Sequence, residues 1–175
     1  IDLPRIQQRL VEAVAAKGKP FTIVLLSGCA LAIPREHDLA AAVLAAWYPG
    51  QAGGTAVADI LFGGVSPSGR LPVTFVRSVE QLPPFTDYAM TGRTYRFMDG
   101  EPLYPFGYGL SYASFAYGSL KLTGAPLAAG ADLELSVEVR NTGTLAADEV
   151  VQAYLSELEA SVRVPRWKLA AFTRV

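Results

Sequence analysis

The first apolar residues of the chain recur at helical spacing. Ile6, Leu10 and Val14 lie four residues apart, Pro4 stands where a first helical turn would begin, and Gly18 follows the last of them. Proline near the start and glycine just past the end are typical of helix boundaries. The pattern therefore predicts an amphipathic helix between Pro4 and Gly18.

The next segments alternate between apolar runs and turns. FTIVLLSG, residues 21–28, is continuously apolar and rich in β-branched residues, which is typical of a strand covered on both faces of a parallel sheet. The pattern then predicts a helix over 36–47, a turn, a helix over 55–62 and a strand over 71–75 that is introduced by a Ser-Pro-Ser-Gly turn. The order helix, strand, helix, helix, strand predicts an α/β fold.

Neither helical nor strand periodicity continues beyond about residue 76. Prolines, tyrosines and glycines crowd the stretch up to residue 113. This composition predicts a long ordered loop, and loops of that length are usually functional or lie at interfaces.

From residue 114 onward, apolar and polar residues alternate. The clearest example is 132–139, where leucine and valine alternate with aspartate, glutamate and serine; 115–122 and 149–156 are similar. Such segments predict half-buried antiparallel strands of a β-sandwich. Three strands cannot close a sandwich, and the sequence stops at FTRV without a turn, so we expect this all-β sandwich to be incomplete.

Composition excludes several classes of function. Fifteen basic and sixteen acidic residues among 175 give a net charge of −1, so neither nucleic acid nor an anionic membrane is an expected partner. The longest apolar run, 39–47, is too short to cross a bilayer, and the N-terminus lacks the layout of a secretion signal. The single cysteine, Cys29, excludes an intramolecular disulfide and leaves too few ligands for a cysteine-based zinc site.

Two reactive side chains have simpler explanations than catalysis. His37 lies between two acids at a predicted helix start, where a surface or capping position is favoured because no partner nucleophile is evident. Cys29 follows the first predicted strand, where α/β folds bind ligands, but it lacks histidine and asparagine partners at a known spacing. For Cys29 a buried, inert position is the favoured interpretation.

The loop sequence DYAMTGRTYRFMDG holds the strongest candidate binding residues. The loop combines apolar and aromatic side chains with the guanidinium of an arginine, as a pocket for a hydroxyl-rich ring would. These residues are Tyr88, Met90, Arg93, Tyr95 and Phe97. An equally supported alternative is that the rings attach the loop to its domain while Arg93 or Arg96 bonds backbone carbonyls.

The nearby acids Asp87, Asp99 and Glu101 could supply a carboxylate pair for sugar hydrolysis, although solvated loop acids are the favoured interpretation.

Several segments together resemble one enzyme family along the whole chain. GKPFTIVLLSG, AAWYPGQAGGTAVADILFGGVSPSGRLPVTF, MTGRTYRF and PLYPFGYGLSYASFAY resemble the C-terminal part of the family-three glycoside hydrolases. GRTYRF and DGEPLYPFG resemble the β-xylosidase-like branch more than the typical β-glucosidases. The resemblance implies the end of an α/β sandwich domain at 1–77, a connecting loop at 78–113 and a truncated fibronectin-type-III-like domain at 114–175. It also implies that SPSGRLPVTF closes the α/β sandwich.

The resemblance implies an enzymatic activity whose two catalytic carboxyl groups match no position in this chain. Members hydrolyse β-linked sugars with retention, using an aspartate nucleophile and a glutamate acid/base, and neither matches a position here. Both carboxyls are required, because one forms the covalent intermediate and the other protonates the leaving group. We therefore expect no catalytic residue and no activity in this chain alone, no metal or organic cofactor, and a substrate-binding role for Met90, Arg93 and Tyr95.

Partners follow from the same resemblance. The substrate would be a β-linked oligosaccharide or aryl glycoside, and a periplasmic or extracellular location is favoured over the cytoplasm. Because 21–28 is apolar on both faces, we also expect a partner segment, either the N-terminal catalytic region of the same protein or a second chain. The alternatives are a non-catalytic carbohydrate-binding or interaction module, and a structural segment with exposed apolar surface.

Overall fold

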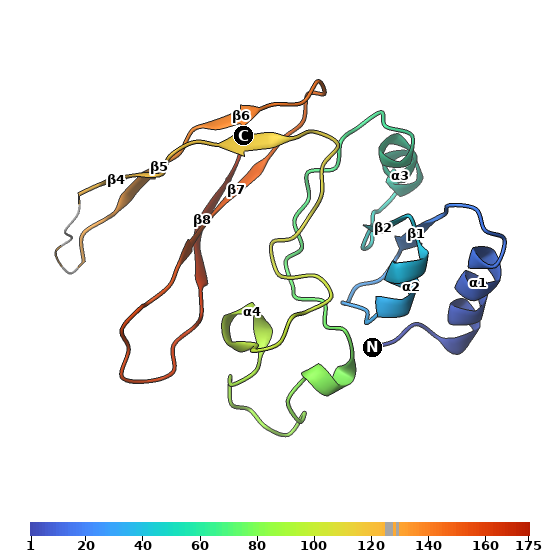
Figure 1. Cartoon of the computed structure of the whole chain (residues 1–175), viewed down its shortest axis with the longest axis horizontal. Coiled ribbons are helices and arrows are strands. Elements are labelled where there is room, and N and C mark those ends of the chain that lie inside the picture. The colour runs from blue at the N-terminus through green and yellow to red at the C-terminus, as the bar shows by residue number, and fades with distance from the viewer. Residues whose placement is uncertain (125–127, 129) are drawn as a thin grey trace.

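The computed structural model describes residues 1–124, 128 and 130–175. An α/β part lies at one end of the molecule, long antiparallel hairpins lie at the other, and extended segments run between them (Figure 1). In chain order the elements of the α/β part are α1 (Arg5–Ala15), β1 (Thr22–Leu25), α2 (Pro34–Leu39), β2 (Ala42–Ala45) and α3 (Gly53–Leu61).

Strands β1 and β2 pair in parallel, with Thr22 opposite Ala42 and Leu25 opposite Ala45. The strand predicted within 21–28 is confirmed as β1, and the helix predicted over 55–62 is confirmed as α3. The helix predicted over 36–47, however, is wrong. The helix there begins at Pro34 and ends at Leu39, and the residues after it form β2. The segment after Leu39 is apolar all round, so periodicity alone could not distinguish a buried strand from a buried helix.

Helix α1 is confirmed, but its apolar stripe faces outward. Ile6 is 71% exposed and Leu10 63% exposed, and Val14 is also exposed. An ion pair of 2.5 Å between Arg35 on α2 and Glu12 joins the two helices. Within the described residues, no other element packs over this stripe of α1, which leaves an apolar surface open.

The core joins the α/β part to the connecting segment. Ile33 is fully buried, and Leu25, Phe75 and Leu103 are buried around it. In chain order, Leu25 comes from β1, Ile33 from the loop before α2, Phe75 from the predicted strand 71–75 and Leu103 from the connecting segment. The core therefore holds Phe75, just before the connecting segment, and Leu103, within its later part, against the sheet.

The strand predicted over 71–75 is wrong as a regular strand. Only Phe75 forms a bridge, an isolated antiparallel one to Tyr104, and Leu71 donates its backbone N–H to Tyr108 O at 2.8 Å. Residues 72–74, which lie between these two contacts, donate no backbone hydrogen bond to that segment, so the ladder is interrupted. The segment runs beside residues 103–108 as an extended chain (Figure 1).

The C-terminal part consists of short antiparallel pairs. In chain order its strands are β3 (Phe115–Tyr117), β4 (Lys121–Thr123), β5 (Glu134–Ser136), β6 (Val139–Asn141), β7 (Val150–Leu155) and β8 (Lys168–Arg174). Strand β3 pairs with β6, β4 with β5, and β7 with β8. The alternation expected over 132–139 is confirmed only in part: Leu133, Val137 and Val139 are half-buried between exposed polar neighbours, whereas Leu135 is exposed. Strand β8 was not predicted.

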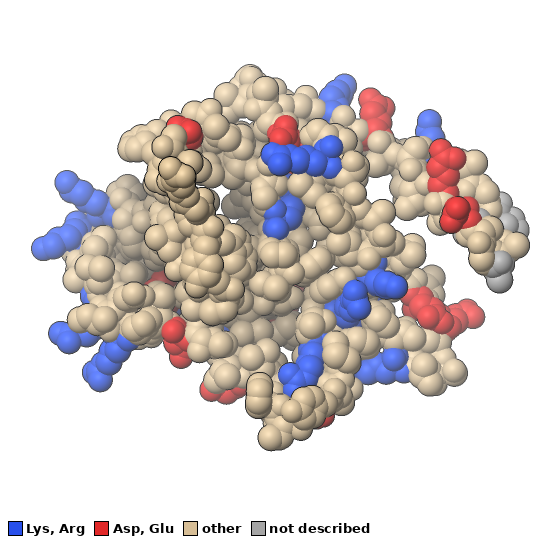
Figure 2. All heavy atoms as spheres, turned by 180° about the vertical axis from the view of Figure 1, so that it is seen from behind, with Lys and Arg blue, Asp and Glu red and all other residues tan. Residues whose placement is uncertain are grey.

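The connecting segment holds little regular structure among its described residues. A single 3-10 turn, η1 (Val79–Gln81), and one short helix, α4 (Thr94–Phe97), interrupt an irregular path. On the face shown in Figure 2, basic and acidic side chains are dispersed among neutral surface. The densest group of charges on this face is basic and lies in the lower middle of the view, with acidic side chains to its right (Figure 2).

Candidate functional site

Arg93 holds the loop before α4 together. Its guanidinium donates to the carbonyl oxygens of Ala89 at 3.1 Å, Pro84 at 3.0 Å and Asp87. Met90, on the same loop, is 48% exposed. Of the two interpretations from sequence, the structure shows Arg93 bonding backbone carbonyls, so most of its donors are occupied within the loop.

Tyr95 faces away from that loop and toward the hairpin of β7 and β8. Its ring stacks on Phe106 with centroids 4.2 Å apart and meets Tyr154 edge-on at 6.3 Å. Its hydroxyl accepts the backbone N–H of Leu169 at 3.2 Å. Burial alone would raise the pKa of Tyr95, but hydrogen bonds and charges from Arg96, the Leu169 N–H and Lys168 together lower it.

A broad cleft of about 850 Å³ opens between the connecting segment and the β7–β8 hairpin. Its aromatic lining comes from both sides: Tyr95, Phe106, Tyr108, Tyr117, Tyr154 and Trp167. Of the three predicted binding residues, only Tyr95 lines this cleft, while Met90 and Arg93 lie outside it. The structure therefore divides the predicted site into two parts.

The loop between β7 and β8 closes one end of the cleft by contacting α4. Arg166 donates to Met98 O at 3.0 Å through its side chain and to Arg96 O at 2.8 Å through its backbone. Arg163 donates to Phe97 O and pairs with Asp99, both at 2.9 Å. Sequence reasoning missed these arginines, because their loop carries no periodic pattern and their partners are mostly backbone carbonyls.

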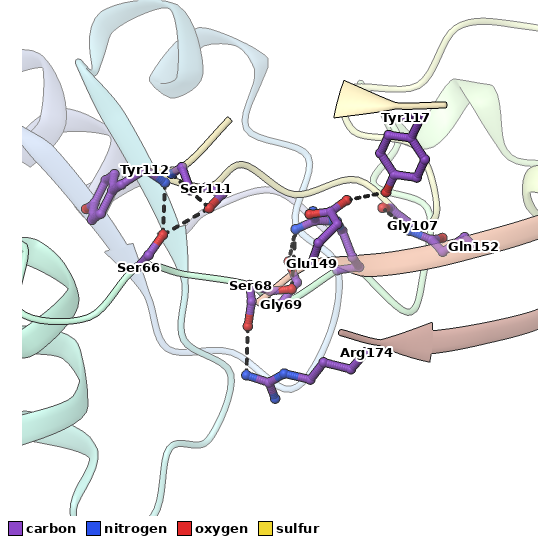
Figure 3. A network of polar contacts seen from close by, with 12 residues as sticks. Ser66, Ser68, Gly69, Gly107, Ser111, Tyr112, Tyr117, Glu149, Gln152 and Arg174 are labelled. Atoms are coloured by element: carbon purple, nitrogen blue, oxygen red, sulfur yellow. Dashed lines mark hydrogen bonds and ion pairs between the residues drawn. The ribbon is translucent and has the colours of Figure 1, made fainter. Parts of the chain in front are cut away.

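A buried polar junction joins the Ser-Pro-Ser-Gly-Arg turn to the hairpins (Figure 3). Arg70 pairs with Glu149 at 2.6 Å, and the two side chains are only 13% and 10% exposed. The hydroxyl of Tyr117 donates to the other oxygen of Glu149 at 2.7 Å. Burial, followed by the bond to this carboxylate and its charge, raises the pKa of Tyr117 to about 12.

Neighbouring contacts extend this junction along the turn. Ser66 bonds the hydroxyl of Ser111 at 2.9 Å and accepts the Tyr112 N–H at 3.0 Å, while Arg174 donates to Ser68 at 2.9 Å (Figure 3). A Cβ atom at Gly109 would overlap a backbone carbonyl of the same turn, so glycine permits this close approach. The turn that sequence analysis assigned to closing the α/β part thus also anchors the hairpins.

The other two candidate residues from the sequence, His37 and Cys29, lie outside the cleft. His37 Nδ1 lies 2.7 Å from the Tyr104 hydroxyl, and burial, with the nearby Tyr108 and Asp38, raises the pKa of Tyr104 to about 12. The expected burial of Cys29 is wrong, since it is exposed beside Ser27 in an open loop after β1.

The three loop acids do not gather into one group. Asp87 accepts the Ala89 N–H, whereas Asp99 and Glu101 both line the cleft. In the part of the chain that the structure describes, no group of three or more His, Cys, Asp or Glu residues is placed to hold a metal ion. Among the same residues, no helix has the length and apolar character that a bilayer span requires.

Comparison with known families gives one match that covers most of the chain. The sequence profile described as "Glycosyl hydrolase family 3 C-terminal domain" matches residues 1–112. A xylan 1,4-β-xylosidase of Xylanibacter ruminicola is 46% identical over 159 residues, which are 91% of this chain and 18% of that protein. A periplasmic β-glucosidase of Salmonella typhimurium is 40% identical over 187 residues, covering all of this chain and 24% of that protein.

Solved structures show the same arrangement. A β-glucosidase from Erythrobacter marinus superposes with a TM-score of 0.86 at 45% identity, over 99% of this chain and 23% of that one. β-Glucosidase 3B from Thermotoga neapolitana, solved with glycerol, superposes with a TM-score of 0.87 at 30% identity, over 99% of this chain and 27% of that one. The chain therefore spans about a quarter of the length of these relatives or less.

Proposed function

The chain belongs to the glycosyl hydrolase family 3 C-terminal domain family, and on this basis we propose that it is the C-terminal portion of a retaining, exo-acting β-glycosidase. The activity would be of the β-xylosidase or β-glucosidase type, releasing terminal β-linked sugars. The observation that carries the proposal is a profile match over residues 1–112 combined with structural similarity over 99% of the chain.

The catalytic carboxyls of this activity lie outside the chain in our proposal. Retaining hydrolysis places two carboxyl groups about 5–5.5 Å apart across one glycosidic bond. Asp99 and Glu101 share the cleft, but Asp99 is paired with Arg163 and exposed to solvent, so nothing in its surroundings suits a proton donor or a nucleophile. This chain alone would therefore bind and position but not hydrolyse.

Met90, Arg93 and Tyr95 shape the outer side of the substrate pocket in this proposal. The contacts of Arg93 with loop carbonyls support an indirect role, in which it holds the loop that presents Met90 to solvent. Tyr95 would fix the other end of that loop through its stacking on Phe106. Arg93 is thus a positioning residue rather than a catalytic one.

The architecture we propose follows the family. Residues 1–77 form the end of an α/β sandwich, residues 78–113 form the connecting loop, and residues 114–175 form part of a fibronectin-type-III-like domain. The antiparallel pairs β3–β6, β4–β5 and β7–β8 support the last assignment. The exposed stripe of α1, with Ile6 and Leu10 more than half exposed, supports a covering partner. That partner would be the N-terminal catalytic region of the same protein or a second chain.

We also place the protein in the periplasm or outside the cell. The support is the similarity to a relative named a periplasmic β-glucosidase. Fractionation of the source cells, with detection by an antibody to this chain, tests the location. Recovery only with the cytoplasmic fraction would contradict it.

Hydrolysis of aryl glycosides tests the main proposal. The complete gene product that contains this chain should release the chromophore from an aryl β-xyloside or an aryl β-glucoside, whereas the 175-residue chain should release none. Product analysis by NMR should show retention of the anomeric configuration. Inactivity of the complete gene product on both substrates would contradict the proposal, as would turnover by the chain alone.

A matched pair of variants tests the loop assignment in the complete gene product. Arg93→Ala removes the donors that hold the loop and should raise KM several-fold with a smaller change in kcat, because the loop shapes binding rather than chemistry. Arg140→Ala is the control, since no ion pair of Arg140 is found among the described residues and it lies on β6, outside both this loop and the cleft. Equal effects of the two variants would contradict the role of Arg93.

A further inference from the structure

We propose that the cleft between the connecting segment and the β7–β8 hairpin binds a short, neutral oligosaccharide independently of catalysis. Its volume of about 850 Å³ lies within the range of about 300–1,000 Å³ typical of small-molecule sites. The cleft's own chemistry carries this inference. Only the choice of β-linked xylo- and cello-oligosaccharides as probes rests on the proposed function.

Accessible aromatic rings are the first argument. Tyr108, Tyr117, Tyr154 and Trp167 line the cleft and are 38%, 50%, 37% and 44% exposed. Rings that are partly buried and partly open present apolar surface at fixed positions, which suits the C–H faces of a sugar ring. They come from the connecting segment, β3, β7 and the loop before β8, so the surface exists only when these elements are assembled.

The charges around the cleft argue for a neutral ligand. Two cations, Arg77 and Arg166, lie among three acids, Asp99, Glu101 and Glu149. Of these acids, Glu149 is already paired with Arg70 and Asp99 with Arg163. Because cations and acids are interspersed, no phosphate or polycation would find a matching surface. Carboxylates that reach solvent, however, accept hydrogen bonds from sugar hydroxyls, and such charge-assisted bonds are stronger than neutral ones.

A buried hydroxyl at the wall of the cleft lacks a partner. Thr74 Oγ1 is the one buried side-chain polar atom among the described residues for which no hydrogen-bond partner is found. Thr74 also lines the cleft. Since buried polar atoms are nearly always paired, we expect this hydroxyl to bond a ligand hydroxyl or a bridging water once the side chain rotates toward the cleft.

Both walls of the cleft are held before any ligand arrives. On one side Tyr95 is stacked on Phe106 and bonded to the Leu169 N–H. On the other side the Arg166 side chain donates to Met98 O and its guanidinium lies 5.1 Å from the centroid of the Trp167 ring. A wall that is ordered in advance lowers the entropic cost of binding a flexible saccharide.

Tryptophan fluorescence offers a direct test because the chain has two tryptophans in different places. Trp167 lines the cleft, whereas Trp47 packs against Phe75 in the core. Titration of the 175-residue chain with xylo- and cello-oligosaccharides should change its fluorescence saturably. The change should persist in Trp47→Phe, where only Trp167 reports, and should disappear in Trp167→Phe.

Calorimetry with a matched pair of variants measures the contribution of the ring. Trp167→Ala should weaken binding at least about fivefold, because an aromatic contact is lost. Tyr88→Ala is the control, since Tyr88 is 89% exposed and lies outside the cleft. If Trp47→Phe fails to fold, as judged by circular dichroism, the unmodified chain compared with Trp167→Phe still decides the origin of the signal.

The outcomes separate this inference from the proposed function. Saturable binding by the chain that Trp167→Ala weakens and Tyr88→Ala does not supports the cleft, even if the complete gene product proves inactive on glycosides. Conversely, no saturable change with either saccharide series, or equal losses in both variants, overturns the cleft assignment even if the complete gene product hydrolyses aryl glycosides.

Discussion

Among the ion pairs of the described residues, two join the hairpins to the rest of the molecule, and they differ in burial. At the junction of the Ser-Pro-Ser-Gly-Arg turn, Arg70 and Glu149 have side chains 13% and 10% exposed. At the contact with α4, Arg163 and Asp99 have side chains 45% and 75% exposed. Both are arginine–carboxylate pairs of similar length, at 2.6 and 2.9 Å, so the difference lies in the solvent around them.

The difference indicates which contact holds the two parts together. Removing one partner of a buried pair leaves a desolvated charge without compensation, whereas an exposed pair exchanges its partner for water at little cost. We therefore expect the Arg70 junction to determine whether the hairpins dock. The α4 contact should instead determine how firmly one end of the cleft is held.

Glu149→Gln should give the largest effect. It removes the negative charge facing Arg70 and leaves a nearly buried guanidinium, which should lower the free energy of unfolding by about 2–4 kcal/mol. Denaturant unfolding followed by circular dichroism measures this change. Asp148→Asn is the control on the adjacent residue, because its pair with Arg174 is more than half exposed on both sides and should matter by less than about 1 kcal/mol.

A second variant separates loss of a charge from loss of packing. Replacing both partners, as Arg70→Met with Glu149→Leu, should recover much of the stability lost in Glu149→Gln, because no unpaired charge remains. A double variant as unstable as Glu149→Gln would show that shape or other hydrogen bonds at the junction dominate. Equal destabilisation by Asp148→Asn and Glu149→Gln would remove the contrast between buried and exposed pairs.

Much of the α/β part could be predicted from local pattern. Helix α1 carries clear periodicity, strand β1 is a continuous apolar run, and residues typical of boundaries flank both. The structure places both elements where those signals lie. The error at β2 arose because an apolar segment without a polar face suits a buried helix and a buried strand equally. Only its parallel pairing with β1 decides between them, and that pairing is a long-range contact.

The site was less predictable because its contacts join distant residues. Arg70 and Glu149 are separated by 79 positions, and Tyr95 and the Leu169 N–H by 74. Sequence analysis singled out Tyr95 for its ring, but nothing local indicated that it would face the hairpin while Arg93 turned to its own loop. Strand β8 was missed because its partner β7 lies across a loop of more than ten residues, without a short hairpin turn.

Tyr117→Phe should give an intermediate effect at the same junction. It removes the hydroxyl that donates to Glu149, which should cost about 1–2 kcal/mol at neutral pH, because a bond to a charged acceptor is lost. The folded protein raises the pKa of Tyr117 to about 12, above the ordinary value near 10. The associated stability is therefore fully present below about pH 10 and is lost as the pH rises toward 12.

Unfolding measured between pH 9 and pH 12 tests this dependence. The unmodified chain should lose stability across the window, and Tyr117→Phe should show a shallower loss. Tyr104→Phe is the matched comparison, since the pKa of Tyr104 is also raised to about 12 but its hydroxyl lies beside His37 in the α/β part. If Tyr117→Phe keeps the full slope, the Glu149 contact does not control this titration.

Arg163→Ala should give the smallest effect on stability and the most local one. Its pair with Asp99 is exposed and contributes about 0–1 kcal/mol, and its bond to Phe97 O can be replaced by water. Hydrogen exchange should nevertheless quicken at the amides of α4, because the loop before β8 would hold that helix through Arg166 alone. Arg140→Ala, on β6 away from this contact, should leave those amides unchanged. A fall in stability as large as that of Glu149→Gln would mean that docking of the hairpins depends on the exposed contact as much as on the buried one.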